Sequence, residues 1–139
     1  MTRLRTPQLA VGAVVLSDNK ILLEKRKKEP NLGQWAIPGG SVQLGETLQE
    51  AVEREIREET GLMVKARDIV HTFEVIERDD NGRIRFHYVI IDLNADVIGG
   101  KLHPSDDALD ARWFGHDELK KVIVTESTQV FLRKSHFIE

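Results

Sequence analysis

The stretch GSVQLGETLQEAVEREIREETGL, residues 40–62, decides the fold of this chain because it contains its clearest helix. An α-helix is predicted over residues 47–59, in which Thr47 is the N-cap and Glu50, three residues later, completes the capping-box pattern. Gly61 stands where a helix C-cap belongs, since glycine adopts the left-handed conformation without steric cost. The segment therefore predicts a helix whose two ends are both fixed by local sequence.

Three glycines, Gly39, Gly40 and Gly45, precede this helix. They predict a flexible turn in which the backbone approaches another backbone segment or a ligand closely. An anionic phosphate can also be accommodated there, because free backbone N–H groups point outward at a helix start. The plainer alternative, glycines that serve only as turn residues, suits Gly45 better than the adjacent pair.

The glutamates of this helix matter more by position than by number. Leu48 and Val52 mark the apolar stripe of the helix. At about 100° per residue, Glu55 and Glu59 fall inside this stripe and Glu58 falls at its edge. Carboxylates that converge on the inner face of a helix repel one another and lose solvation. We therefore expect a compensating positive charge beside them.

Two kinds of compensation fit these carboxylates. Arg54 is a basic partner in the same segment, but a single arginine cannot neutralise three carboxylates. Oxygen-only ligands favour Mg²⁺ or Mn²⁺ over softer metals, so a divalent metal site is the first hypothesis. A structural ion-pair cluster is the alternative. By contrast, Glu50, Glu53 and Arg57 lie on the opposite side of the helix, where an ordinary solvated face is expected.

Composition narrows the class of protein. The 139 residues are 40% hydrophobic and 31% charged, with a formal net charge of −3, which predicts one folded domain over residues 1–139. The absence of cysteine excludes disulfides, thiolate catalysis and cysteine-ligated zinc. No stretch approaches the roughly 20 apolar residues of a membrane span, and the N-terminus lacks the apolar run of a signal peptide. A slightly acidic chain disfavours nucleic-acid polymers as partners, so a cytoplasmic protein with small-molecule ligands is expected.

The rest of the chain consists of short apolar runs separated by turn residues. Asn81 and Gly82 form the pair favoured by tight hairpins, between two runs rich in β-branched and aromatic residues. Strands are predicted over residues 9–16, 20–23, 34–37, 68–77, 83–93 and 111–114, and further helices over residues 116–122 and 126–134. Strands on both sides of a central helix predict an α/β fold of the α+β type, with helices packed on a mixed sheet.

Residues 40–62 together resemble the Nudix box, the motif of the MutT-like Nudix hydrolases. The family pattern is Gly, five residues, Glu, seven residues, Arg-Glu, an aliphatic residue, any residue, Glu-Glu, any residue, Gly and an aliphatic residue. Every defined position is matched, by Gly40, Glu46, Arg54, Glu55, Ile56, Glu58, Glu59, Gly61 and Leu62. The segments at residues 35–39 and 111–114 are also similar to those of many family members.

The resemblance implies the Nudix fold, a mixed sheet sandwiched between helices, with the box as a loop–helix–loop. It also implies Mg²⁺- or Mn²⁺-dependent hydrolysis of the pyrophosphate bond of a nucleoside diphosphate linked to another moiety. By position in the motif, it implies that Glu55, Glu58 and Glu59 are the metal ligands. The backbone carbonyl of Gly40 would join them, as it does in some relatives.

Two further box residues have implied supporting roles. Arg54 would pair with a box glutamate and orient it, and Glu46 would be an acid near the site, more structural than catalytic. Both roles agree with the charge argument, because a cluster of carboxylates needs a fixed arrangement before it can hold a cation.

Hydrolysis of a pyrophosphate also needs a base that takes a proton from the attacking water. In relatives, this base is either a box glutamate or an acid from a loop beyond the second half of the sheet. In the loop before Trp113 the candidates are Asp106, Asp107 and Asp110, and the distance from that tryptophan favours Asp107. The alternative is that these aspartates serve as turn caps.

Three residues outside the helix are candidates for substrate binding. Arg26, in the basic run at residues 25–28, is the best candidate for a phosphate contact, although a solvated loop explains the run about as well. Trp35 either stacks on a base or packs beneath the glycine-rich loop. Gly39 would bring the backbone close to the ligand.

The resemblance favours ADP-ribose or a related nucleoside diphosphate sugar as substrate, because short family members similar to this chain act on such compounds. Relatives specific for ADP-ribose often carry a proline shortly after the box, at positions where this chain has Glu77 and Arg78. The alternatives are a nucleoside triphosphate pyrophosphohydrolase that removes modified nucleotides and a non-catalytic nucleotide-binding domain. A homodimer is a further expectation, since related hydrolases of this size often form one.

Overall fold

The structure is a computed structural model that describes residues 6–103, 108–135 and 137. Its strands are β1 (Gln8–Ser17), β2 (Lys20–Arg26), β3 (Trp35–Ala36), β4 (Gly39–Ser41), β5 (Leu62–Arg78), β6 (Ile84–Gly100) and β7 (Ala108–Phe114). Its helices are α1 (Leu48–Thr60), α2 (His116–Leu119) and α3 (Glu126–Lys134). Within the described residues, none of these helices has the length and apolar character needed to cross a membrane. The predicted order of elements is confirmed, with β4 added in front of the central helix.

One mixed sheet joins the strands in the order β3-β2-β1-β6-β5, while β4 pairs with β1 and β7 pairs with β2. β1 runs parallel to β6, with Gln8 opposite Tyr88, and the other pairs are antiparallel. The predicted hairpin of β1 and β2 is confirmed by the register of Leu16 opposite Ile21. β1 therefore lies at the centre of the sheet, between two groups of antiparallel strands.

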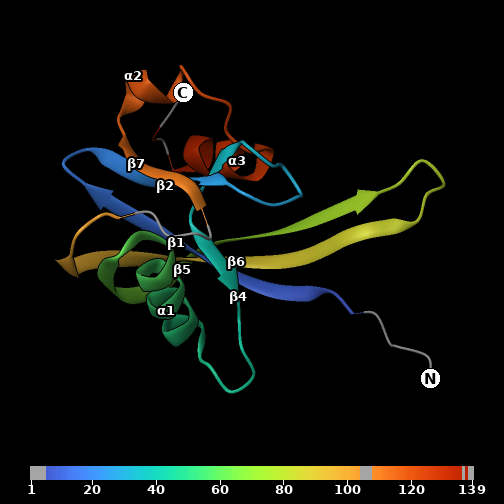
Figure 1. Ribbon diagram of the computed structural model, residues 1–139, viewed down its shortest axis with the longest axis horizontal. Helices are drawn as coiled ribbons and strands as arrows, with labels where there is room; N and C mark the ends of the chain where they lie inside the picture. Colours follow the sequence, from blue (N-terminus) through green and yellow to red (C-terminus); the bar gives the residue numbers. More distant parts are fainter. Residues whose placement is uncertain (1–5, 104–107, 136, 138–139) are drawn as a thin grey trace.

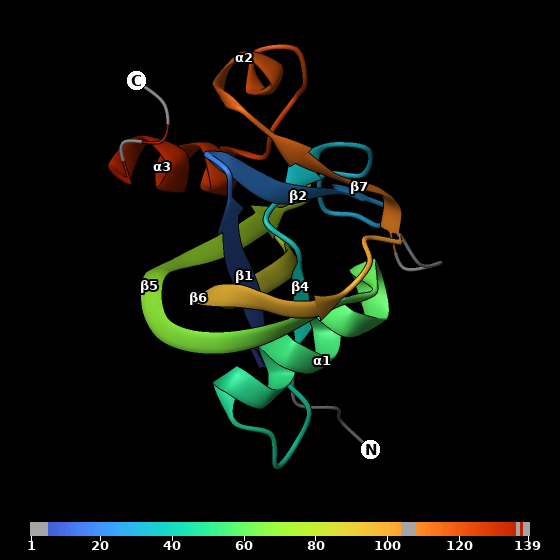
Figure 2. The same ribbon diagram turned by 90° about the vertical axis from the view of Figure 1, so that its left-hand side faces the viewer.

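Helices cover both faces of this sheet (Figure 1, Figure 2). Because side chains alternate along a strand, Val11 and Val14 of β1 belong to different cores. α1 packs on one face, where Val52 and Ile56 lie in the same buried cluster as Val11. On the opposite face, Phe131 of α3 lies in the same cluster as Val14. The predicted fold class, a mixed sheet between helices, is confirmed.

The ends of α1 are as predicted. Glu50 donates its backbone N–H to the Thr47 hydroxyl at 3.1 Å, and its carboxylate accepts from the Thr47 N–H at 3.0 Å. Gly61 ends the helix in the left-handed region, with φ of 77°. β5 begins directly after it, at Leu62, which pairs with Gly100 of β6. The helix is therefore tied to the sheet without an intervening loop.

Several element boundaries differ from the prediction, and those of the strands depend on pairing across the sheet. β5 and β6 each contain 17 residues: β5 extends beyond the predicted strand at both ends, and β6 begins one residue later than predicted and continues to Gly100. The far end of this hairpin projects from the body (Figure 1). β2 continues past Leu23 to Arg26, because β3 and β7 pair with it on either side. The helix predicted over residues 116–122 ends at Leu119.

Candidate active site

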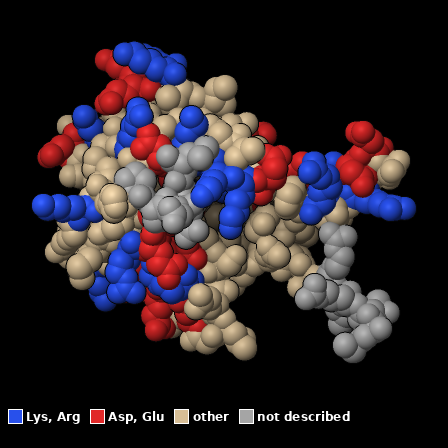
Figure 3. Space-filling model, viewed as in Figure 1, with Lys and Arg blue, Asp and Glu red and all other residues tan. Residues whose placement is uncertain are grey.

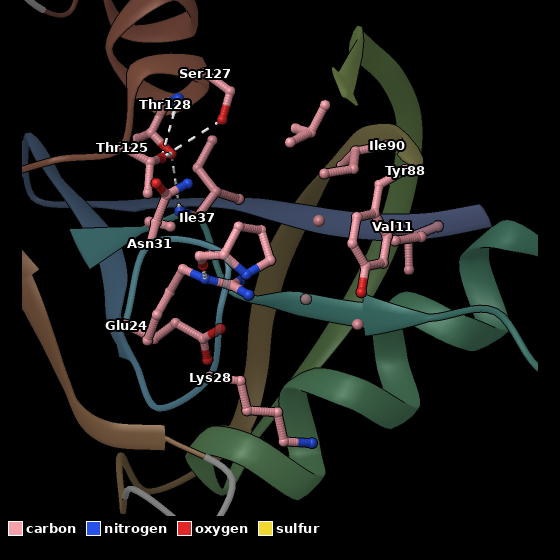
Figure 4. A pocket seen from close by; sticks show the side chains of 18 of the residues that line it. Val11, Glu24, Lys28, Asn31, Ile37, Tyr88, Ile90, Thr125, Ser127 and Thr128 are labelled. Atoms are coloured by element: carbon pink, nitrogen blue, oxygen red, sulfur yellow. Dashed lines mark hydrogen bonds between the residues drawn. The ribbon is translucent and has the colours of Figure 1, made fainter. Parts of the chain in front are cut away.

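A cleft of about 370 Å³ lies between the sheet, α1 and the loop after β2. We call the part lined by Glu24, Glu55, Glu58 and Glu59 the acidic part, and the part lined by Phe73, Tyr88, Ile90 and Asp92 the sheet part. Figure 4 shows Glu24 and Lys28 on one side of this cleft, Tyr88 and Ile90 of β6 on another, and hydroxyl side chains at the start of α3 above them. The dimensions suit a small molecule, which typically occupies a pocket of about 300–1,000 Å³.

The helical periodicity of α1 turns part of the box toward this cleft. Glu59 is 7% exposed, Glu55 is partly buried, and Glu58 is about half exposed at the edge, as the predicted angles require. Acidic side chains gather over this helix on the surface (Figure 3). Glu53 differs from the prediction of a solvated face, because its carboxylate accepts the backbone N–H of Ala66 at 2.9 Å. The start of β5 therefore covers part of the outer side of the helix.

The two adjacent glycines of β4 lie so close to neighbouring atoms that neither position has room for a side chain. A Cβ atom on Gly39 would collide with the backbone of Val11, to which β4 is paired. A Cβ atom on Gly40 would collide with the Glu55 carboxylate, whose Oε1 would be only 2.6 Å away. Gly45 has nothing within 4 Å of such an atom, and its φ of 89° marks a turn residue. Gly40 therefore makes room for a carboxylate at the floor of the acidic part.

Arg54 is the centre of an ion-pair network on the same helix. Its Nε and Nη2 donate to the two carboxylate oxygens of Glu46 at 2.6 and 2.9 Å, which is the bidentate geometry that arginine favours. Its Nη1 donates to Glu55 at 2.8 Å and to Glu58 at 3.3 Å. Arg54 lowers the pKa of Glu46 to about 2, assisted by the backbone N–H of Gln43. Glu46 therefore stays ionised and holds the arginine in place.

Glu59 lies in the opposite electrostatic environment. Burial is the main cause that raises the pKa of Glu59 to about 12, and the hydrogen bond and negative charge of Glu24 add to it, followed by Glu55. Glu24 is itself 5% exposed, at the point where β2 passes beside α1. At neutral pH a proton is therefore held between these two carboxyl groups when no cation is near.

The donor set fits a divalent cation. Glu59 Oε2 is buried and has no hydrogen-bond partner among the described residues. The neighbouring groups are carboxylates and a glycine carbonyl, the hard oxygen donors that Mg²⁺ and Mn²⁺ prefer. In the part of the chain that the structure describes, no three His, Asp or Glu side chains are already arranged to ligate one metal ion. Two of the expected ligands, Glu55 and Glu58, contact Arg54 instead.

The predicted substrate-binding residues separate into two groups. Arg26 and Gly39 line the cleft, together with Lys27 and Lys28 of the same basic run. Arg26 Nε donates to the carbonyl of Pro30 at 2.7 Å, which holds the loop after β2 against the strand. Trp35 is 6% exposed and does not belong to the described lining of the cleft. Its ring packs edge-on against Phe114, with centroids 4.8 Å apart, so its observed contacts are those of a core residue.

Of the three predicted loop acids, the structure describes one, Asp110. Asp106 and Asp107, the favoured base, lie outside the described residues. Asp110 belongs to β7, where its carboxylate accepts from the backbone N–H of Ala111 at 2.8 Å and from Arg112 Nε at 2.7 Å. It is not among the described residues that line the cleft. Its contacts match the alternative of a local structural role.

Sequence reasoning missed two buried acids of the cleft, Glu24 and Asp92. Both interrupt apolar runs, since Glu24 follows Leu23 in β2 and Asp92 lies between Ile91 and Leu93 in β6. Each is 5% exposed or less. A carboxylate within an apolar strand is costly to bury, and this signal was available in the sequence.

The box helix, the glycine pair and the mixed sheet define a NUDIX-domain protein. The model of that family, the NUDIX domain, matches residues 6–134, and the chain belongs to this family. A protein of Methanocaldococcus jannaschii named ADP-ribose pyrophosphatase is 45% identical over 116 residues, which cover 84% of this chain and 66% of that protein. The chain thus spans slightly less than two thirds of the length of this relative.

A second relative and a solved structure are similar to most of this chain. An oxidized purine nucleoside triphosphate hydrolase of Danio rerio is 31% identical over 121 residues, covering 82% of this chain and 70% of that protein. Among solved structures, a MutT NUDIX hydrolase from Burkholderia pseudomallei has 32% sequence identity and a TM-score of 0.73. The match covers 93% of this chain and 98% of that one, so the whole described fold is shared.

Proposed function

We propose that this protein hydrolyses the pyrophosphate bond of a nucleoside diphosphate linked to another moiety, with ADP-ribose or a related nucleoside diphosphate sugar as its favoured substrate. One water is added across the P–O–P linkage, so ADP-ribose gives AMP and ribose 5-phosphate. The observation that carries the proposal is the convergence of Glu55, Glu58 and Glu59 with Glu24 on one cleft. The 45% identity to an archaeal ADP-ribose pyrophosphatase supports the choice of substrate.

The proposed mechanism assigns the acidic part to a divalent cation. Glu55, Glu58, Glu59 and the carbonyl of Gly40 would hold Mg²⁺ or Mn²⁺. When bound, such an ion neutralises charge on the pyrophosphate oxygens and makes water a better nucleophile. Glu59 must then release its proton, because the cation offsets the burial and the negative charge of Glu24 that raise its pKa.

The remaining residues position the reacting groups. Arg54 holds Glu55 and Glu58 beside each other, and Glu46 fixes Arg54 through two hydrogen bonds. Arg26 and the neighbouring lysines line the same cleft and would contact the phosphates of the substrate. The base that takes the proton from water is a box glutamate or Asp107.

A second substrate class is favoured by a specific observation. The relative from Danio rerio is named an oxidized purine nucleoside triphosphate hydrolase, and this chain covers 70% of it. Glu77 and Arg78 also occupy the positions where many ADP-ribose-specific relatives carry a proline. Hydrolysis of a modified nucleoside triphosphate to a monophosphate and pyrophosphate is therefore the alternative. A non-catalytic nucleotide-binding domain is the third candidate, although such domains usually lose box glutamates and this chain retains them all.

A substrate panel distinguishes these candidates. The protein is incubated with Mg²⁺ or Mn²⁺ and ADP-ribose, nucleoside diphosphate sugars, dinucleoside polyphosphates, or normal and oxidised deoxynucleoside triphosphates. We expect AMP and ribose 5-phosphate from ADP-ribose at the highest kcat/KM. A monophosphate and pyrophosphate formed fastest from a triphosphate would establish the alternative instead. Absence of turnover across the panel would overturn catalysis and favour a binding domain.

The assembly and the location of the protein stay predictions. A homodimer is expected from the size of the chain and its family, and sedimentation in solution measures it directly. A cytoplasmic location is expected from the sequence alone, and cell fractionation tests it.

A further inference from the structure

Asp92 is a buried carboxyl group in the sheet part of the cleft. It is 1% exposed, it belongs to the residues that line the cleft, and it lies on β6. Its Oδ2 has no hydrogen-bond partner among the described residues. Burial alone raises the pKa of Asp92 to about 7, with no neighbouring charge contributing to the shift. A buried carboxyl oxygen without a hydrogen-bond partner is costly to the folded state, so its presence in a cleft points to a ligand.

The neighbouring strand leaves room for this carboxyl group. Gly12 of β1 stands opposite Asp92 in the parallel pairing of β1 and β6. A Cβ atom on Gly12 would collide with Asp92 Oδ1 and would lie 3.1 Å from a methyl carbon of Ile37. Only glycine at this position therefore leaves the carboxyl group in its place.

The surroundings of Asp92 fit a flat heteroaromatic ring. Tyr88 and Ile90 lie four and two residues before Asp92 on β6, so the three side chains share one face of the sheet. Phe73 of β5 lines the same cleft, and Thr128 of α3 lines it from the opposite side. Figure 4 shows Tyr88 and Ile90 reaching into the cleft from the sheet while Thr128 faces them from α3. An apolar and aromatic wall with one polar anchor is typical of a pocket that binds such a ring.

We propose that Asp92 is a specificity-determining residue that hydrogen-bonds the exocyclic amino group of the substrate's nucleobase, which is adenine in the substrate proposed above. The inference rests on that proposed function for the identity of the base. The Asp92 carboxyl group accepts a hydrogen bond from the amino N–H. In its neutral form it also donates to the adjacent ring nitrogen, which matches the donor–acceptor pair of adenine.

Binding of a nucleotide without hydrolysis tests this assignment. Titration calorimetry in Mg²⁺ compares AMP with purine riboside 5′-monophosphate, which lacks only the amino group. We expect the wild-type protein to bind AMP about 10-fold or more tightly than the analogue, because a polar site built for a hydrogen bond rejects a ligand that cannot form it. Equal affinities for the two nucleotides would overturn the inference.

Two variants identify Asp92 as the residue responsible. Asp92→Asn keeps an acceptor and a donor in the same positions, and we expect it to retain the preference for AMP. Asp92→Leu has the same number of heavy atoms and no polar group, and we expect its two affinities to agree within about 2-fold. If the leucine variant does not fold, Asp92→Ala replaces it. A preserved preference in the apolar variant would contradict the proposal.

The matched control is Asp96→Leu on the same strand. Asp96 is exposed and pairs with Arg67, and it is outside the described lining of the cleft, so its removal is expected to leave the AMP preference unchanged. The nucleotide-binding experiment needs no turnover. Failure to hydrolyse ADP-ribose would therefore overturn the proposed function, whereas equal affinities of the wild-type protein for AMP and its analogue would overturn only the role of Asp92.

Discussion

Two groups of carboxylates on the same box differ in how their charge is compensated. Glu46 receives two hydrogen bonds from Arg54, and these lower its pKa to about 2. Glu59 is buried beside Glu24, and its pKa is raised to about 12. Arg54 therefore stabilises the ionised form of Glu46, whereas burial and the neighbouring Glu24 stabilise the neutral form of Glu59.

This difference separates a structural role from a binding role. Glu46 gains little from a metal, because its bidentate counter-ion, Arg54, already replaces the lost solvation. A buried carboxylate without one stabilises the folded protein only when a proton or a cation joins it. The burial of Glu59 beside Glu24 thus favours cation binding in the acidic part of the cleft, and the number of glutamates in the box alone does not show this.

The largest effect is expected from removing the charge of the proposed ligands. Glu58→Gln and Glu59→Gln should each lower kcat for the best substrate by about 10²-fold or more while the fold stays intact. The matched control is Glu50→Gln on the same helix, where glutamine still completes the capping box and kcat should stay within about 3-fold. Near-normal Mg²⁺-dependent turnover in either ligand variant would refute the assignment.

Metal binding itself should be visible without any substrate. At a Mg²⁺ concentration 100 times its Kd, the wild-type free energy of unfolding should rise by about 2.7 kcal/mol. In Glu59→Gln the metal-free protein should be at least as stable as wild type, because a buried acid beside Glu24 has been removed. The Mg²⁺-induced rise should shrink, and thermal unfolding with and without metal measures both. An undiminished rise in the variant would place the cation elsewhere.

How much of the structure the sequence predicts depends on whether the contacts are local or distant along the chain. The ends of α1 were predictable because Thr47, Glu50 and Gly61 act within a few residues of each other. The inward positions of Glu55 and Glu59 followed from helical periodicity alone. The family motif then supplied the implied chemistry of the same residues.

The missed acids depend on strands that lie far apart in the sequence. The apolar run predicts a strand that ends at Leu23, because a charged residue such as Glu24 is rarely buried. Asp92 was predicted as one more strand residue, since its meaning depends on Gly12, which faces it only through the parallel register of β1 and β6. That register arises from the whole sheet and is not encoded near either residue.

The Arg54 network should contribute more to stability than other basic residues of α1. Arg54→Met leaves Glu46 and Glu55 without their charged donor, which should cost about 2 kcal/mol of unfolding free energy. The control is Arg57→Met, an exposed position one turn later on the same helix, where less than about 1 kcal/mol is expected. Urea denaturation of the metal-free proteins measures both, and equal losses would show that the network adds nothing specific.

Asp92 extends the comparison to a buried carboxyl group whose pKa is raised by burial, without a contribution from a charged group among the described residues. Its pKa is about 7 in the folded protein and 3.8 in the unfolded chain, so the folded state binds more protons between these values. Stability should therefore fall as the pH rises through this window, by about 1.4 kcal/mol per pH unit near its middle, and level off above pH 7.

Asp92→Asn removes this titration while keeping the shape of the side chain. The stability difference between the variant and wild type should grow between about pH 4 and pH 7. Urea denaturation in metal-free buffer across that range measures the difference, so titration of the box glutamates cancels. A constant difference would mean that Asp92 is hydrated or paired in solution, and the contrast between compensated and uncompensated carboxylates would then be confined to the acidic part of the cleft.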